Sequence, residues 1–331
     1  MAISMAPDRK TIVCVGSALV DMLAKEDDSF LEAAGAAKGS MTLVEREYID
    51  DLAAKTTDPP VTVSGGSACN TAAGVGMLGG KARFVGKLGR DQMGEIFEAD
   101  LAKNGVSPYL FDSPAPTGRV LSVITPDAQR TMFTYLGASA EMTPEEITGQ
   151  CFANAAVVHV EGYLLFNPEL MMAVVKGAKA SGARISLDLA SFNVVEASLD
   201  LLNGIVADYI DILIANEDEA FAYTGISDEE KSLQVLARKV EVAVLKIGPR
   251  GSLIHGAGEV TRVERMGDGS AADTTGAGDL WAAGFLYGLV NGYSFSKSGA
   301  LGSACGFEVC QVVGAKIGED GWQRIRRQLA A

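Results

Sequence analysis

The stretch DTTGAGD at residues 273–279 decides the fold assignment, because it places a glycine-rich turn directly before a helical pattern at Leu280–Leu289. Its glycines allow a sharp turn and a close approach of backbone N–H groups to a ligand. The following helix directs its first amides and the positive end of its dipole at the same point. This arrangement predicts a phosphate site that needs no basic side chain.

Asp279, the last residue of this stretch, has two interpretations. As a carboxylate at the start of a helix it can simply cap the helix. As a general base it can take the proton of a hydroxyl group that attacks a γ-phosphate. The stretch by itself leaves both open.

Outward from this stretch, short apolar runs alternate with helical patterns such as Pro168–Ser181 and Glu217–Tyr223. Six runs predict strands: Thr11–Gly16, Arg83–Gly86, Ala156–Val160, Arg184–Asp188, Ile210–Ala215 and Ala243–Ile247. Continuous apolar strands that alternate with helices are typical of a mainly parallel sheet covered on both faces. Ligands of such sheets bind outside the carboxyl ends of the strands.

A second β-layer is predicted from a different pattern. Gly118–Thr125 and Arg130–Leu136 both alternate in hydropathy around a turn at residues 126–128, which indicates a hairpin. Ala18–Leu23 and Gly39–Val44 supply further strands. A small sheet over the strand ends would form a lid, and lids exclude water from reacting phosphates.

The composition restricts the class of protein. The 331 residues include 28 Lys and Arg but 42 Asp and Glu, for a formal net charge of −14. Nucleic acid and anionic membrane surfaces are therefore poor partners. There is no apolar run of membrane-spanning length, no secretory leader pattern and an odd number of cysteines, five, without a CxxC pair. These features predict a cytoplasmic protein.

A second glycine-rich stretch, VSGGSACN at residues 63–70, runs into a helical pattern at Thr71–Leu78. Gly65 and Gly66 end a strand and allow close backbone approach, and Asn70 can offer both a donor and an acceptor to a polyol. The alternative is a strand–helix turn capped by a buried asparagine.

Asp21 follows the first strand and an apolar segment. Its carboxylate suits two adjacent sugar hydroxyls, although an exposed aspartate at a strand end is the alternative. A GxGxxG string at Gly74–Gly79 lies inside a helical pattern instead of after a strand. We therefore interpret its glycines as close helix packing and not as a dinucleotide site.

Both glycine-rich stretches, with GKLGRD at residues 86–91 and Gly94, resemble the signatures of the PfkB, or ribokinase-like, family of carbohydrate and nucleoside kinases. The resemblance spans roughly Ile12 to Ile317. It implies one three-layer α/β/α domain over residues 1–331, with a mainly parallel sheet and a lid from about residues 17–45 and 117–137. The implied reaction transfers the γ-phosphoryl group of ATP to a primary hydroxyl of a sugar or nucleoside.

The resemblance also implies roles for single residues. Asp279 would be the catalytic base. The anion hole would consist of Gly276, Ala277 and Gly278, together with the amide of Asp279. The acceptor would be held by Asp21, Gly65, Gly66 and Asn70.

The nucleotide side is implied by further motifs. Asn216 and Glu219 resemble the family's NxxE motif, which holds Mg²⁺ largely through water. The alternative is an asparagine N-cap followed by an acidic first turn. Nucleotide contacts are implied for Asn216, Lys246, Gly248, Gly251, Thr275 and Ser303, the last of which stands where many relatives have Asn. A monovalent-cation site near Asp273 and Thr275 is also implied.

The acceptor is left open by the sequence. The adenosine-kinase-like branch of the family is similar in three segments, residues 38–41, 130–138 and 161–164. An apolar, aromatic lid also suits a stacked base. Adenosine is therefore our first expectation, with ribose, fructose and other sugars as alternatives. Two other classes also stay open: a nucleotide-dependent dehydrogenase and a non-catalytic sugar- or nucleoside-binding protein. We expect a small-molecule substrate and either a monomer or a homodimer.

Overall fold

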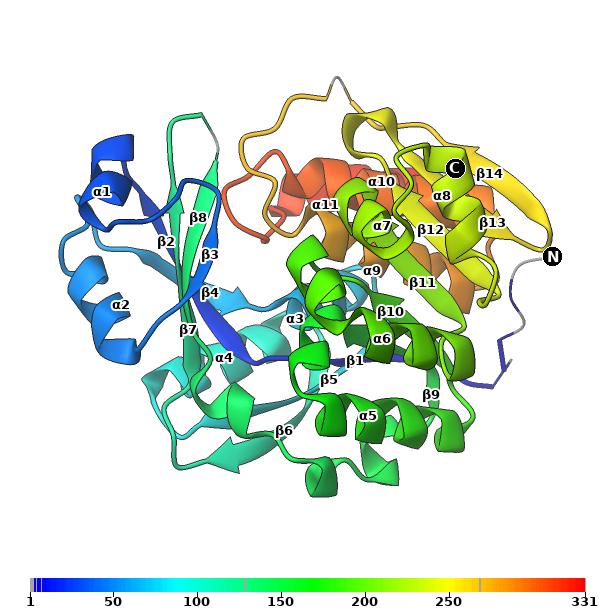
Figure 1. Ribbon diagram of the computed structural model, residues 1–331, viewed down its shortest axis with the longest axis horizontal. Coiled ribbons are helices and arrows are strands. Elements are labelled where there is room, and N and C mark those ends of the chain that lie inside the picture. Colours follow the sequence, from blue (N-terminus) through cyan, green and yellow to red (C-terminus); the bar gives the residue numbers. More distant parts are fainter. Residues whose placement is uncertain (1–2, 4, 7, 128, 268, 331) are drawn as a thin grey trace.

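The computed structural model describes residues 3, 5–6, 8–127, 129–267 and 269–330. These residues form a large sheet and a smaller one (Figure 1). The strands of the large sheet, in spatial order, are β14 (Glu259–Val263), β13 (Ser252–Gly256), β12 (Val242–Lys246), β11 (Ile212–Asn216), β10 (Arg184–Asp188), β9 (Ala155–Glu161), β1 (Thr11–Val15), β5 (Lys81–Gly89) and β6 (Val106–Ser113). Neighbouring strands from β12 to β6 are parallel, and β13 and β14 add antiparallel pairs at one edge.

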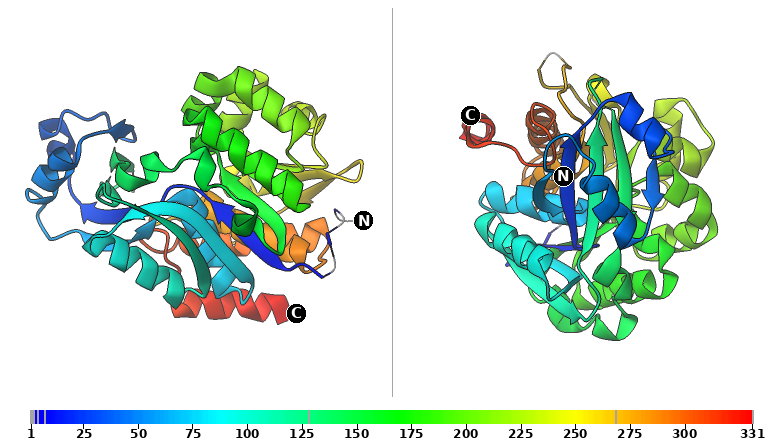
Figure 2. Two further views of the ribbon diagram at one scale, coloured as in Figure 1. Left: turned by 90° about the horizontal axis from the view of Figure 1, so that it is seen from below. Right: turned by 90° about the vertical axis from the view of Figure 1, so that its left-hand side faces the viewer.

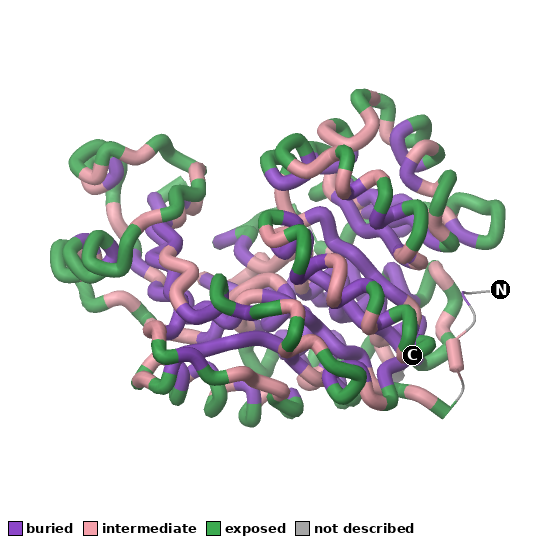
Figure 3. Tube along the Cα trace, turned by 60° about the horizontal axis from the view of Figure 1, so that its bottom comes forward, coloured by how far each residue is buried: buried purple, intermediate pink, exposed green. Residues whose placement is uncertain are grey.

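Both faces of the large sheet are buried, which explains the continuous apolar runs. Along β1, Ile12 and Cys14 pack into one core while Val13 and Val15 pack into the other. One face is covered by α3 (Ser67–Met77), α4 (Gln92–Lys103), α9 (Ala277–Val290) and α10 (Phe295–Val309), with α11 (Glu319–Ala330) against α10. The opposite face is covered by α5 (Pro168–Ser181), α6 (Phe192–Asp208), α7 (Glu217–Thr224) and α8 (Glu229–Leu236). Figure 2 shows the two helical layers, and Figure 3 shows that the strands between them are the most buried part of the chain.

The second sheet lies beside the carboxyl ends of the parallel strands, at the left in Figure 1. Its strands, in spatial order, are β3 (Met41–Leu43), β8 (Arg130–Tyr135), β7 (Gly118–Ile124), β2 (Leu19–Lys25) and β4 (Val61–Gly65). Two short helices, α1 (Asp28–Ala33) and α2 (Arg46–Ala53), share a small apolar core with one face of this sheet. The other face is left to line a cavity.

The predicted α/β class, with a mainly parallel sheet and a small second sheet, is confirmed. Each of the six predicted strands is present, and α5 begins and ends where its pattern predicts. The predicted hairpin is the antiparallel pair β7–β8, and Ala128 of its predicted turn lies outside the described residues. The edge strands β6 and β14 were not predicted, because strands that are only partly covered lack a continuous apolar run. The inner strand β13 was not predicted either, although it is mostly buried. None of the described helices has the length and apolar character needed to cross a membrane.

The GxGxxG string packs helices together, as its position inside a helical pattern predicted. A Cβ atom on Gly74 would lie 2.6 Å from the Cβ of Ala283 on α9. A Cβ atom on Gly76 would lie 2.0 Å from the carbonyl oxygen of Asn104, at the end of α4. The glycines thus let α3 approach its neighbours closely.

Replacing Gly76 by alanine should therefore destabilise the protein, because the new methyl group meets fixed backbone. We expect the free energy of unfolding to fall by about 1–3 kcal/mol. The matched control is Gly204→Ala in α6, where a Cβ meets nothing within 4 Å. That variant should gain about 0.5–1 kcal/mol from helix propensity. Urea unfolding of both variants checks this, and similar shifts in the two would contradict the packing role.

Candidate active site

A cavity of about 880 Å³ lies between the carboxyl ends of the parallel strands and the inner face of the second sheet. Its charged lining side chains are Asp21, Arg130, Glu161, Glu169, Asp188, Glu219, Lys246 and Asp279, most of which gather at one polar end. The opposite wall is apolar and consists of Leu19, Met41, Leu43, Val120, Met132, Leu136, Met142, Tyr163, Leu164 and Phe166. This size and this mixture of surfaces suit a small-molecule ligand.

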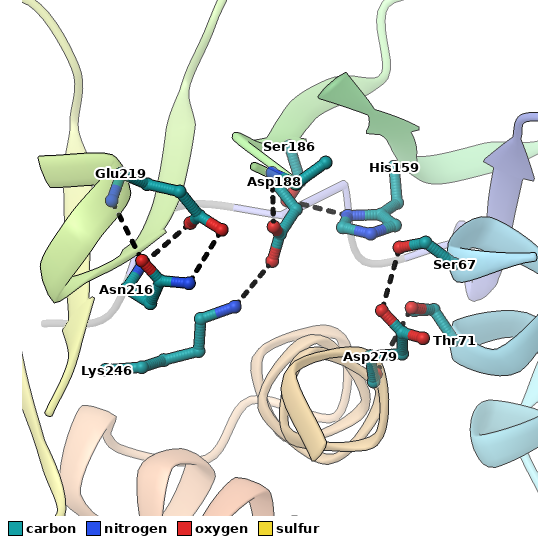
Figure 4. Close-up of polar contacts among 10 residues, drawn as sticks. Ser67, Thr71, His159, Ser186, Asp188, Asn216, Glu219, Lys246 and Asp279 are labelled. Atoms are coloured by element: carbon teal, nitrogen blue, oxygen red, sulfur yellow. Dashed lines mark hydrogen bonds and ion pairs between the residues drawn. The ribbon is translucent and has the colours of Figure 1, made fainter. Parts of the chain in front are cut away.

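Asp279 lies in the first turn of α9, where the helix points into the cavity. Its carboxylate accepts hydrogen bonds from the Ser67 hydroxyl (2.8 Å) and from Nδ2 of Asn70 (2.9 Å). Figure 4 shows Ser67 of α3 pointing at Asp279 across the helix contact. Desolvation raises the pKa of Asp279, while the two hydrogen bonds act in the opposite direction. The geometry therefore holds an oriented carboxylate that is more basic than an ordinary aspartate.

The start of α9 is built to receive an anion. Gly276 precedes the helix with φ at +73°, a conformation that favours glycine. Within the described residues, the Ala277 amide donates to the carbonyl oxygen of Thr274 (3.2 Å), whereas the amides of Gly278 and Asp279 have no hydrogen-bond partner and are left for a ligand. Ala277 and Gly278 also line the cavity. A Cβ on Gly278 would lie 2.9 Å from Nζ of Lys246, so a cation stands beside these amides.

The predicted acceptor residues meet at the same end of the cavity. Asp21 on β2 is 8% exposed, and burial raises its pKa to about 6. Gly65 leaves room for that carboxyl group, because a Cβ there would lie 2.3 Å from the Asp21 side chain. Gly66 lines the cavity, as does Asn70, whose buried Oδ1 has no hydrogen-bond partner among the described residues. These groups fit a ligand rich in hydroxyls.

Asn216 and Glu219 form a reciprocal capping box at the start of α7, which is the alternative that the sequence left open. Oδ1 of Asn216 accepts from the Glu219 amide (2.9 Å), while the Glu219 carboxylate accepts from the Asn216 amide and from its Nδ2 (both 2.8 Å). Both residues also line the cavity. No cluster of three or more His, Cys, Asp or Glu side chains suited to a metal occurs among the described residues.

The capping box still fits a hydrated magnesium ion. The carboxylate oxygens of Glu219 retain lone pairs beyond the hydrogen bonds that they accept. Burial, and after it the nearby charge of Asp188, raise the pKa of Glu219 to about 7. A cation at the cavity would favour the charged form of Glu219. The magnesium role therefore stays a prediction, with contact through water as its form.

The remaining predicted nucleotide residues are not brought to the cavity wall. Ser303 is buried within α10, and Gly248 and Gly251 lie in the turn after β12. Thr275 is buried, and its amide and hydroxyl both donate to Asp273. Asp273 also accepts from the amide of Gly314, so its carboxylate ties two loops together. The nucleotide and monovalent-cation roles of these residues stay predictions.

Two buried carboxylates of the cavity were missed from the sequence. Glu161, at the end of β9, accepts from the amides of Ser17 (2.7 Å) and Ala68 (3.0 Å), and burial raises its pKa to about 7. Asp188, at the end of β10, forms an ion pair of 2.8 Å with Lys246. Each of these two carboxylates is the last residue of an apolar strand, at the edge of the sheet where ligands bind. An acidic residue at that position was the available signal.

Comparisons with known proteins agree on the class. A family model described as pfkB family carbohydrate kinase matches residues 9–320. The crystal structure of adenosine kinase from Sinorhizobium meliloti is similar with a TM-score of 0.89 and 35% identity, and the match covers 98% of this chain and 100% of that one. A probable sugar kinase from Rhizobium etli is similar with a TM-score of 0.90 and 31% identity over the whole of both chains. A 5-dehydro-2-deoxygluconokinase from Bacillus subtilis is 28% identical over 308 residues, which are 88% of this chain and 87% of that protein.

The raised pKa of Asp21 predicts a pH dependence of stability. A carboxyl group with a higher pKa in the folded than in the unfolded protein stabilises the fold below its unfolded pKa. That contribution is lost as the pH rises through the folded pKa. Between about pH 4 and pH 6, wild type should therefore lose up to about 3 kcal/mol relative to Asp21→Asn. Urea unfolding of both proteins across this range checks the result, and parallel pH profiles would contradict it.

Proposed function

The chain belongs to the pfkB family of carbohydrate kinases, and we propose on this premise that it transfers the γ-phosphoryl group of ATP to a primary hydroxyl of a nucleoside, with adenosine as the leading acceptor. Its cofactor in this reaction is magnesium. The observation that carries the proposal is the position of the Asp279 carboxylate at the amide end of α9, inside a cavity that holds both polyol-binding groups and an apolar wall.

Asp279 acts as the general base. It faces the cavity, and its hydrogen bonds to Ser67 and Asn70 fix the direction of its oxygens. Desolvation raises its pKa, which brings the basicity of the carboxylate closer to that required near neutral pH. The acceptor hydroxyl gives its proton to Asp279 as its oxygen attacks the γ-phosphorus.

The phosphate groups bind without a basic surface. The amides of Gly276, Ala277, Gly278 and Asp279 and the dipole of α9 supply the anion site. Magnesium would supply positive charge that offsets the charge of the phosphate oxygens, and Asn216 and Glu219 would hold it through water. These local devices allow a chain of net charge −14 to bind a polyanion.

The acceptor is supported by the division of the cavity into two surfaces. Asp21 and Asn70 offer oxygens to ribose hydroxyls at the polar end. The wall from the second sheet, with Val120, Met132 and Leu136, together with Tyr163 and Phe166 beyond β9, offers an apolar surface to a base. A free sugar would leave most of that wall in contact with water. The similarity to the Sinorhizobium meliloti adenosine kinase supports the same acceptor.

A sugar acceptor is the second candidate, because the curated relatives that match include 5-dehydro-2-deoxygluconokinase and fructokinases. Asp21 and Asn70 would serve a ketose or an aldose as well as a ribose. A protein that only binds such ligands is the third, and the oriented base at Asp279 argues against it.

A panel of acceptors assayed for ADP release with MgATP tests this proposal. Adenosine should give the highest kcat/KM, above ribose, fructose and 5-dehydro-2-deoxygluconate. Asp279→Asn should lower kcat by about 10²–10⁴-fold, the usual contribution of a general base, while adenosine binding is kept. Asp200→Asn, on the exposed side of α6, is the matched control and should be unchanged. If a sugar is turned over faster than adenosine, that sugar replaces adenosine as the proposed acceptor. Full turnover by Asp279→Asn would show that Asp279 is not the general base.

A further inference from the structure

The polar end of the cavity carries an excess of negative charge that backbone amides alone do not offset. Six of the lining side chains are acidic, namely Asp21, Glu161, Glu169, Asp188, Glu219 and Asp279, whereas the cations of the lining are Arg130 and Lys246. A triphosphate brings further negative charge to this surface. A cation near the transferred group is therefore needed to offset the repulsion.

Lys246 is the cation that lies at the phosphate end. It is the last residue of β12, and its neighbour in register on β11 is Asn216. Its Nζ stands so close to the first turn of α9 that a Cβ on Gly278 would be 2.9 Å away. Arg130, by contrast, lies on β8 of the second sheet, at the acceptor side, where its positive charge opposes the rise that burial causes in the pKa of Asp21.

The ammonium group is held in place by Asp188. Oδ2 of Asp188 accepts from Nζ at 2.8 Å, and Oδ1 accepts from the amide of Ala190 at 3.0 Å. Ala190 itself has φ at +64°, an uncommon conformation for a residue with a side chain. Both oxygens of Asp188 are thus engaged, so its direction is fixed and it fixes the direction of Lys246. Figure 4 shows this pair between the capping box and the start of α9.

The ion pair with Asp188 leaves N–H donors of the Lys246 ammonium group without an acceptor in the described part of the chain. An ammonium group has three N–H donors, and among the described residues Asp188 is the one hydrogen-bond acceptor of Nζ. The Lys246 side chain is 14% exposed and lines the cavity. Burial alone would lower the pKa of Lys246, but Asp188 and Glu219 raise it above its ordinary value, so the group stays charged.

We infer that Lys246 is a catalytic residue that contacts the transferred phosphoryl group beside the amides of α9, and that Asp188 is the positioning residue that aims it. This inference rests on the proposed function. In the step, the bond from the γ-phosphorus to the bridging oxygen of ADP breaks and a bond to the acceptor oxygen forms. The acceptor proton passes to Asp279. Lys246 gives up no proton; it stabilises charge on the phosphoryl oxygens as they pass between the two partners.

Lys246→Met tests the inference, because methionine keeps an unbranched side chain only one atom shorter than that of lysine and removes its charge. We expect kcat to fall by about 10²–10³-fold, as for the loss of other preorganised donors, with little change in the KM of the acceptor. We also expect ATP to lose about tenfold or more affinity relative to ADP in calorimetric titrations with magnesium. The matched control is Lys87→Met, which breaks the partly buried pair of Lys87 and Glu146 outside the cavity lining and should keep both properties.

Two more variants keep the test decisive. Lys246→Arg keeps the charge and should retain more turnover than Lys246→Met, and it replaces that variant if Lys246→Met does not fold. Asp188→Asn should also reduce the preference for ATP over ADP, and its effect should not add to that of Lys246→Met. Turnover within threefold of wild type and an unchanged preference for ATP in Lys246→Met would overturn the inference. If wild type phosphorylates no acceptor, the proposed function fails, and the titrations of ATP and ADP still decide the role of Lys246.

Discussion

The contact between α3 and α9 is the interaction on which the candidate site depends. Ser67 and Asn70 donate to the Asp279 carboxylate, and Thr71 donates to its carbonyl oxygen at 3.1 Å. Glycine at position 74 lets the two helices approach closely enough for these bonds. Two segments that lie about two hundred residues apart in the sequence thereby become one unit. The proposed base, anion site and acceptor site then share a fixed geometry, which is the condition for preorganised catalysis.

The electrostatics of the cavity follow from burial. Burial raises the pKa of Glu161 and Glu219 to about 7 and that of Asp21 to about 6, with Asp188 adding to the shift of Glu219. Such a surface repels phosphate unless positive potential is concentrated at one point. The first turn of α9 is that point, and in our account Lys246 and a hydrated magnesium ion strengthen it. Acidity of the whole chain and binding of a polyanion are thus compatible.

Much of this arrangement is predictable from the sequence, and what is missed has physical reasons. The strands buried on both faces carry continuous apolar runs, so β10 was predicted to the residue, whereas edge strands such as β6 lack such a run. The glycine-rich turns mark Asp279 and Asn70 as candidates, and the roles proposed for them come from the family resemblance. The ion pair of Asp188 and Lys246 joins residues 58 apart in the sequence. They lie on β10 and β12, with β11 between them, so only the order and register of strands in the folded sheet bring them together.

The hydrogen bond from Ser67 to Asp279 offers the most direct test of the central claim, that the contact of α3 and α9 tunes the base. We would measure kcat as a function of pH for wild type and for Ser67→Ala. Since this hydrogen bond lowers the pKa of Asp279, its loss should move the acid limb of the profile to higher pH while turnover on the plateau is largely kept. Superimposable acid limbs would show that the helix contact does not set the basicity of Asp279.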